Sequence, residues 1–128
     1  MATFPVTTGD VLTAATYNSL PTFTVGTANT NDYTAVLADQ YQALEIMNKA
    51  TAIAFKIPTN ASVAFPIGTA ITVLNIGVGV CTISAVTSGT TTVLSAGATA
   101  AAPTLAQYKS AVCIKTATDT WYVVGAVA

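Results

Sequence analysis

"VAFPIGTAITVLNIGVGVCTISAV" covers residues Val63 to Val86 and contains no charged side chain. A membrane-spanning helix needs about 20 consecutive apolar residues, so this stretch is long enough to be one. Proline and glycine interrupt it at Pro66, Gly68, Gly77 and Gly79. Between these breaks, β-branched residues alternate with others, as in "TAITVLNI", and a period of two is typical of strands. The stretch therefore predicts short strands joined by turns, and no transmembrane helix.

The composition limits what the chain can do. Its 128 residues suit one domain with one core. Only 7% of the residues are charged, against roughly 25% in a typical soluble domain. The net charge is −1, and all four basic residues are lysines, which argues against nucleic-acid binding. The start "MATFPVTTGD" lacks the basic segment and apolar core of a secretory signal, so we expect the chain to stay in the cytoplasm where it is made.

The rest of the chain continues the strand pattern. Turn-forming Gly, Pro, Asn and Ser separate the segments, and Asp119 marks a short hairpin link. Many short strands at close spacing predict an all-β domain, an antiparallel sandwich or a barrel-like body. The expected strands cover residues 33–38, 43–49, 51–57, 62–65, 69–76, 80–85, 90–95, 109–116 and 120–126.

The opening of the chain differs from this body. "VLTAATYNSLP" (Val11 to Pro21) predicts one short helix, which Thr13 could cap and Pro21 would end. An isolated helix of this length is marginal in water, so it needs a surface to pack on. We therefore expect an N-terminal arm over residues 1–22 and a β-rich body over residues 23–128. The apolar side chains that would attach the arm are Phe4, Val11, Leu12, Tyr17 and Leu20.

Seven segments, in order along the chain, carry a resemblance to a known family. They are "YTAVLAD" (33–39), "EIMNKATAIAFKIP" (45–58), "NASVAFPIGTAITV" (60–73), "GVGVCTI" (77–83), "LSAG" (94–97), "AQYKSA" (106–111) and "TDTWYVVGAVA" (118–128). Together they resemble a β-domain common in structural proteins of tailed bacteriophages, found in tail fibres and in head-fibre or capsid decoration proteins. The opening "TTGDVLTAATYNSLP" is similar to short N-terminal pieces of virion proteins.

The resemblance implies a β-rich, usually trimeric virion component with no catalytic residues and no cofactor. Its partners would be copies of itself and the major capsid protein or another virion protein, with no nucleic acid and no membrane. The short chain favours a capsid decoration (cement or head-fibre) protein in the virion, assembled in the host cytoplasm. A tail-fibre or lectin-like receptor-binding component remains the alternative.

The charge deficit points the same way without the resemblance. A monomer with so few charges would expose neutral, partly apolar sheet faces and edges to water. Interfaces are depleted in charge at their centres, so contact with copies of the chain or with a capsid lattice would cover these faces. We therefore expect a homotrimer whose arm reaches a neighbouring subunit or the shell.

No set of residues in the sequence predicts a catalytic or metal-binding site. Cys81 and Cys113 lie on separate expected strands as buried thiols, and a disulfide is the alternative if those strands are adjacent. The carboxylates are scattered along the chain, and we expect them to be solvated groups in loops. They are Asp10, Asp32, Asp39, Glu45 and Asp119. "NTND" around Asn29, Asn31 and Asp32 is read as a turn, with a calcium loop as the alternative. Without histidine we expect no transition-metal site.

Exposed aromatic rings could serve a sugar-binding role. Trp121 and Tyr122 are neighbours on one expected strand, so they face opposite sides, one in the core and one at a surface. Tyr122 and Tyr108 are the candidates for an exposed aromatic surface. Packing is the simpler explanation for both.

Overall fold

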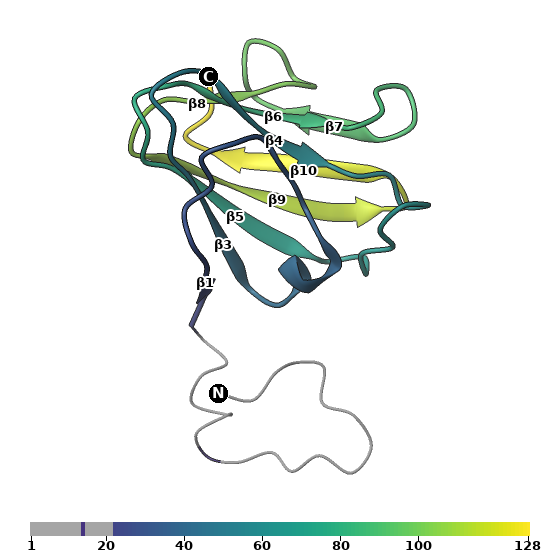
Figure 1. Ribbon diagram of the computed structural model, residues 1–128. Coiled ribbons are helices and arrows are strands. Elements are labelled where there is room, and N and C mark those ends of the chain that lie inside the picture. The colour runs from purple at the N-terminus through teal and green to yellow at the C-terminus, as the bar shows by residue number, and fades with distance from the viewer. Residues whose placement is uncertain (1–13, 15–21) are drawn as a thin grey trace.

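The computed structural model describes Ala14 and residues 22–128, which form two β-sheets that face each other across one core (Figure 1). One 3-10 helix, η1 (Leu37–Gln40), joins the second and third strands. The strands are β1 (Thr24–Val25), β2 (Tyr33–Thr34), β3 (Ala43–Met47), β4 (Ile53–Ile57), β5 (Ala70–Asn75), β6 (Cys81–Ala85), β7 (Thr92–Ser95), β8 (Thr104–Leu105), β9 (Lys109–Ala117) and β10 (Thr120–Gly125).

The prediction of an all-β body is confirmed, but the predicted antiparallel arrangement is wrong. The larger sheet has the strand order β1-β3-β5-β9-β10-β7, and the smaller has the order β2-β4-β6-β8. Five of the eight strand pairs are parallel, namely β1 with β3, β3 with β5, β7 with β10, β2 with β4, and β4 with β6. The other three, β5 with β9, β9 with β10 and β6 with β8, are antiparallel. Both sheets are therefore mixed.

The parallel pairs arise because the chain crosses from one sheet to the other after almost every strand. From β1 to β6, odd-numbered strands enter the larger sheet and even-numbered strands enter the smaller one. The chain thus winds as a flattened coil, and each strand lies beside the one two places earlier. Paired residues are 28 positions apart in one pair of strands from each sheet, β3 with β5 (Leu44 with Thr72) and β4 with β6 (Ile53 with Cys81). No crossover helix is needed, because the return path is itself a strand.

The turns of this coil also stack. The amides of Ile76 and Gly77 donate to the carbonyl oxygen of Met47, and Gly79 donates to that of Lys49. A Cβ atom at Gly79 would overlap the carbonyl oxygen of Thr51. Glycine is therefore required where one turn lies directly on the turn before it, and it does not mark a reversal of the chain there.

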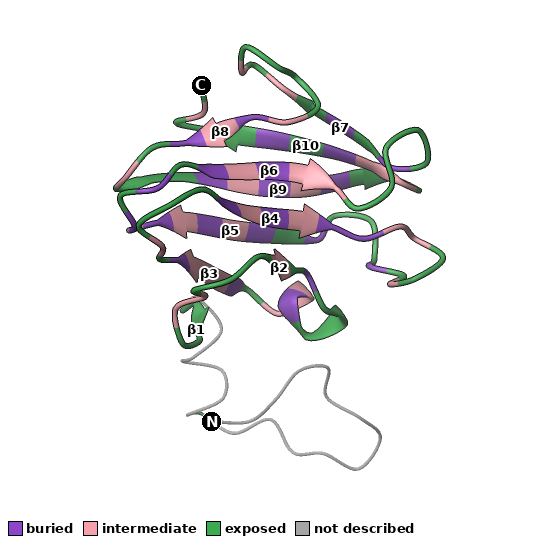
Figure 2. Cartoon of the chain, turned by 45° about the horizontal axis from the view of Figure 1, so that its top comes forward, coloured by how far each residue is buried: buried purple, intermediate pink, exposed green. Residues whose placement is uncertain are grey.

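Alternating side chains from the two sheets form the core, visible as alternating colours along the strands in Figure 2. Phe65 packs edge-on against Trp121, with ring centroids 5.5 Å apart and an interplanar angle of 89°. Asn75 is fully buried, and its carboxamide donates to the carbonyl oxygens of Gly79 and Leu105. This amide ties a stacked turn to the short strand β8.

Several strand predictions fail at their ends or entirely. Expected strand 33–38 stops at Thr34, and η1 follows. Expected strand 62–65 is a turn, because the carbonyl oxygen of Thr59 accepts the N–H groups of Ser62 and Val63. Strands β1 and β8 were not expected. The predicted helix over residues 11–21 lies outside the described residues apart from Ala14, so the arm of residues 1–22 stays a prediction.

Candidate interaction surface

The outward side of the six-stranded sheet is the most distinctive surface of the described residues, and we call it the apolar face. Along β5, β9 and β10, the residues of this face alternate with buried residues that point into the core. None of the outward positions on its strands carries a charged side chain. The apolar face consists of Val25, Leu44, Ile46, Ala70, Thr72, Leu74, Leu94, Ser110, Val112, Ile114, Tyr122 and Val124.

Strand register arranges these side chains in rows. One row crosses five strands and contains Val25, Leu44, Thr72, Val112 and Val124. The second row runs through Ala70, Ile114, Tyr122 and Leu94. The third contains Ile46, Leu74 and Ser110. Neighbours within a row come from hydrogen-bonded strands, so they form ridges that are apolar except at Thr72 and Ser110.

The size of the apolar face is that of an interaction site. Each of the twelve residues covers about 4.8 Å across the sheet and about 6.6 Å along its strand. The projected area is therefore on the order of 300 to 400 Å², which is in the range of the largest apolar patches of monomeric proteins, and such patches are often functional.

The opposite outward side, on the four-stranded sheet, has a different chemistry. Its outward positions are small and mostly hydroxylated, and they include one cation, Lys56. The other members are Thr34, Ala54, Thr82, Ser84 and Thr104. Hydroxyl groups hydrogen-bond to water, so this side suits solvent, and the two outer sides of the body are not equivalent.

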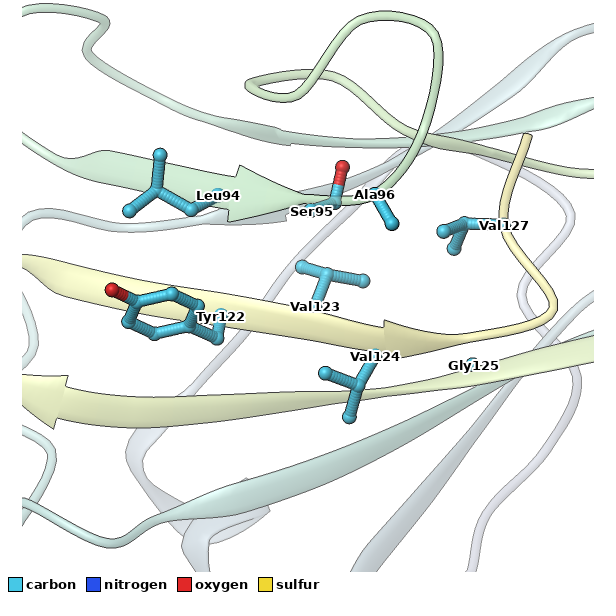
Figure 3. Close-up of a pocket in the computed structure, with 8 residues that line it drawn as sticks. All are labelled: Leu94, Ser95, Ala96, Tyr122, Val123, Val124, Gly125 and Val127. Atoms are coloured by element: carbon cyan, nitrogen blue, oxygen red, sulfur yellow. The ribbon is translucent and has the colours of Figure 1, made fainter.

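A shallow apolar pocket of about 310 Å³ opens at the edge of the apolar face (Figure 3). It lies where β7 ends beside β10 and the C-terminal segment. Leu94 and Tyr122 line it together with Ser95, Ala96, Val123, Val124, Gly125 and Val127. Almost all of these side chains are apolar, so the pocket fits an apolar group better than a charged one.

The two aromatic residues proposed for a sugar surface are both exposed but lie apart. Trp121 points into the core, whereas Tyr122 is 43% exposed, as the alternation predicts. Tyr108 is 75% exposed and precedes β9, while Tyr122 pairs with Ile114 six positions further along that strand. At about 3.3 Å per residue the two rings are on the order of 20 Å apart, so they do not form one platform.

The prediction of solvated carboxylates is wrong for Asp39 and Glu45, because Asp39 is buried and Glu45 is partly buried beside it. Asp39 is buried and accepts hydrogen bonds from the Tyr33 hydroxyl (2.8 Å) and the Val36 amide (2.9 Å). Burial, and next hydrogen bonding with Asp39, raise the pKa of Glu45. Burial and the neighbouring Asp39 also raise the pKa of Tyr33. These contacts fix η1 and the start of β3 against β2, which is a structural role.

The polar loop before β2 also has a structural role. The Asn29 carboxamide donates to Glu45 (3.0 Å) and to the carbonyl oxygen of Ile46. The Asp32 carboxylate accepts the amide of Ala54 at 2.9 Å. The polar side chains of the loop therefore connect strands, as the turn interpretation requires. Within residues 22–128 no group of three or more Cys, Asp or Glu side chains is arranged to hold a metal ion.

Cys81 and Cys113 are buried and unpaired, as predicted. Burial raises the pKa of Cys81 to about 11 and that of Cys113 to about 12. The thiolate is the reactive form of cysteine, so both groups are inert at neutral pH. Of the predicted attachment residues, Phe4, Val11, Leu12, Tyr17 and Leu20 all lie outside the described residues.

Sequence reasoning missed a buried polar cluster at Lys115. This lysine follows Ala111 and Cys113 on the inward side of β9, so the alternation itself indicated a buried cation. Its ammonium group donates to the Asn60 carboxamide and to the Phe65 carbonyl oxygen. The backbone N–H of Asn60 in turn donates to the Asp119 carboxylate at 2.7 Å.

Comparisons with protein-family models, with curated proteins and with solved structures find no match to this chain. Among the described residues, no helix has the length and apolar character that crossing a membrane would need.

Proposed function

We propose that this chain is a non-enzymatic structural component of a tailed-bacteriophage particle, a homotrimer that decorates the capsid. The single observation that carries the proposal is the charge-free apolar face, which is large enough to serve as an interaction site. The resemblance of seven ordered segments to phage virion β-domains supplies the class of particle. The all-β body is consistent with such a component.

The difference between the two outer sides gives the trimer an orientation. The apolar face packs against neighbouring copies, because interface centres are poor in charge. The hydroxylated side of the four-stranded sheet remains in water. The pocket beside Leu94 and Tyr122 receives an apolar side chain from the adjacent subunit.

Attachment to the shell depends on the arm of residues 1–22. Three arms on one trimer bind as a linked set, so a weak single contact becomes effective through valency. Each contact contributes about 25 cal/mol per Å² of apolar area buried, less the cost of ordering the segment. A decoration protein of this kind stabilises a particle by adding buried area between shell subunits.

Deleting residues 1–22 tests the attachment model. We expect a folded trimer that no longer sediments with particles, since the body keeps its apolar face and loses its arms. Circular dichroism and light scattering check the fold and the mass of the deletion variant. Retained attachment would assign docking to the β-body instead.

Copy number separates the capsid from the tail. A decoration protein is present in a stoichiometric ratio to the shell protein, and quantitative mass spectrometry of purified particles measures that ratio. A few copies per particle would instead support the tail-fibre or receptor-binding alternative, and complete absence from particles would contradict both.

A further inference from the structure

Lys115 is a buried lysine whose hydrogen-bond acceptors carry no charge. Its side chain points between the sheets and is 2% exposed. The Nζ atom donates to Asn60 Oδ1 at 2.5 Å and to the carbonyl oxygen of Phe65 at 2.7 Å. Buried cations are normally paired with an anion. A neutral carboxamide in this position calls for a different explanation.

The Asn60 side chain is held in place from two directions. Asn60 lies in the segment that leads from β4 to β5, and its backbone N–H donates to Asp119 Oδ1 at 2.7 Å. The Thr91 hydroxyl donates to the same oxygen at 3.1 Å. Asp119 stands in the hairpin turn after β9 with φ of 54°. One hairpin therefore fixes both the backbone and the carboxamide of Asn60.

The two side chains are close enough to react. Because lysine is only a donor, the carboxamide oxygen must be the atom that faces it. A C=O bond is about 1.2 Å long, so Asn60 Cγ lies within about 3.7 Å of Nζ. Reactive encounters in enzymes bring the reacting atoms to about 3 to 3.5 Å. A small rotation of the carboxamide would present its carbon to the amine.

Attack on Asn60 Cγ would release the carboxamide nitrogen, and this nitrogen has an open path to solvent. The Asn60 carboxamide nitrogen has no hydrogen bond within the described residues, and no buried side-chain nitrogen there lacks a partner. The nitrogen of Asn60 is therefore in contact with solvent, while Lys115 is buried and its amine contacts the Phe65 carbonyl oxygen.

We propose that Lys115 and Asn60 form an intramolecular isopeptide bond. The deprotonated Nζ attacks Cγ, an N–C bond forms, and the bond from Cγ to Nδ2 breaks. One amine proton passes to the departing nitrogen, which leaves as ammonia. Starting from the ammonium form of Lys115, the positive charge leaves as an ammonium ion. The step needs no oxidant, cofactor or second protein.

The cross-link would tie the connection between β4 and β5 to the hairpin of β9 and β10. It would close a covalent loop between positions 60 and 115, which restricts the unfolded chain in the way a disulfide does. Unlike a disulfide, such a bond is not broken in a reducing cytoplasm. This inference does not depend on the proposed function.

The intact mass of the purified wild-type protein, held folded at neutral pH and then denatured, tests the inference. We expect a mass lower than that of the sequence by one ammonia molecule, and a branched peptide joining residues 60 and 115 after digestion. A mass equal to that of the sequence would overturn the proposal. So would ammonia loss without the branched peptide, since a cyclic imide at Asn60 gives the same mass.

Two variants separate these chemistries. Lys115→Met removes the nucleophile, keeps an apolar stem of similar length, and should restore the full sequence mass; an imide at Asn60 would survive this change. Asn60→Asp should lose water in place of ammonia if the cross-link forms. The wild-type measurement decides the proposal even if a variant does not fold.

Discussion

Placing one charge on the apolar face should separate the oligomer into monomers. Val124 lies on that face and is 50% exposed in the single chain, so Val124→Glu leaves the new carboxylate in water until subunits associate. A half-exposed valine presents on the order of 75 Å², worth about 2 kcal/mol when buried. Burying an unpaired carboxylate costs several kcal/mol more.

Together these effects weaken each interface by about 5 kcal/mol or more, which exceeds three orders of magnitude in the association constant at about 1.4 kcal/mol per tenfold change. The matched control is Thr82→Glu, which adds the same charge to the hydroxylated side of the four-stranded sheet. Sedimentation equilibrium should give three times 12.9 kDa for the wild type and the control, and 12.9 kDa for Val124→Glu. A trimeric Val124→Glu protein, or a monomeric wild type, would refute the reasoning.

Three further predictions concern the body. Gly79→Ala should cost about 3 kcal/mol of unfolding free energy in urea, because the added methyl group overlaps the stacked turn, whereas Gly26→Ala, with open space around it, should change it by less than about 0.5 kcal/mol. The pKa of Glu45 is raised in the fold, so the stabilisation that this carboxyl group gives the fold is complete below the ordinary carboxyl pKa and is lost as pH rises through the raised value. The free energy of unfolding of the wild type should therefore fall relative to that of Glu45→Gln between acidic and neutral pH. A pH-independent difference between the two proteins would contradict this. A thiol reagent at pH 8 should label Cys81 and Cys113 only after denaturation, and rapid labelling of the native protein would be inconsistent with their burial.

Local pattern was sufficient where neighbours along the chain decide the structure. The alternation predicts that Trp121 and Tyr122 face opposite sides, and in the structure Trp121 is inside and Tyr122 outside. Asp119 lies in the predicted turn, between β9 and β10. The two cysteines were expected on inward positions and are found there. In each case the residues two positions away carry the needed information.

The direction of the strands could not be predicted in the same way. An alternating pattern looks the same in a parallel and an antiparallel strand, so the coil depends on which distant segments lie together. The sequence predicts chain reversals at Gly77 and Gly79, whereas glycine is required at both positions because the backbone of the preceding turn lies against them. The regular offset between paired residues becomes visible only once the pairs are known.

Side-chain contacts with the backbone explain the other failures. The Asp39 carboxylate accepts the Val36 amide and the Tyr33 hydroxyl, and this local closure replaces the end of an expected strand by η1. Lys115 and Asn60 are far apart in sequence, so their contact is invisible in either segment alone. The apolar face, in contrast, agrees with the prediction made from the low charge content of the sequence.

The winding of the chain has a consequence during synthesis on the ribosome. When residues up to Ala85 have emerged, strands β1 to β6 can stack, but β5 and β6 each have one edge without a partner. Those edges are taken by β9 and β8, which are made later. A nascent or truncated chain that ends before Lys109 therefore presents an unpaired edge of β5 to neighbouring polypeptides, a site for premature strand exchange.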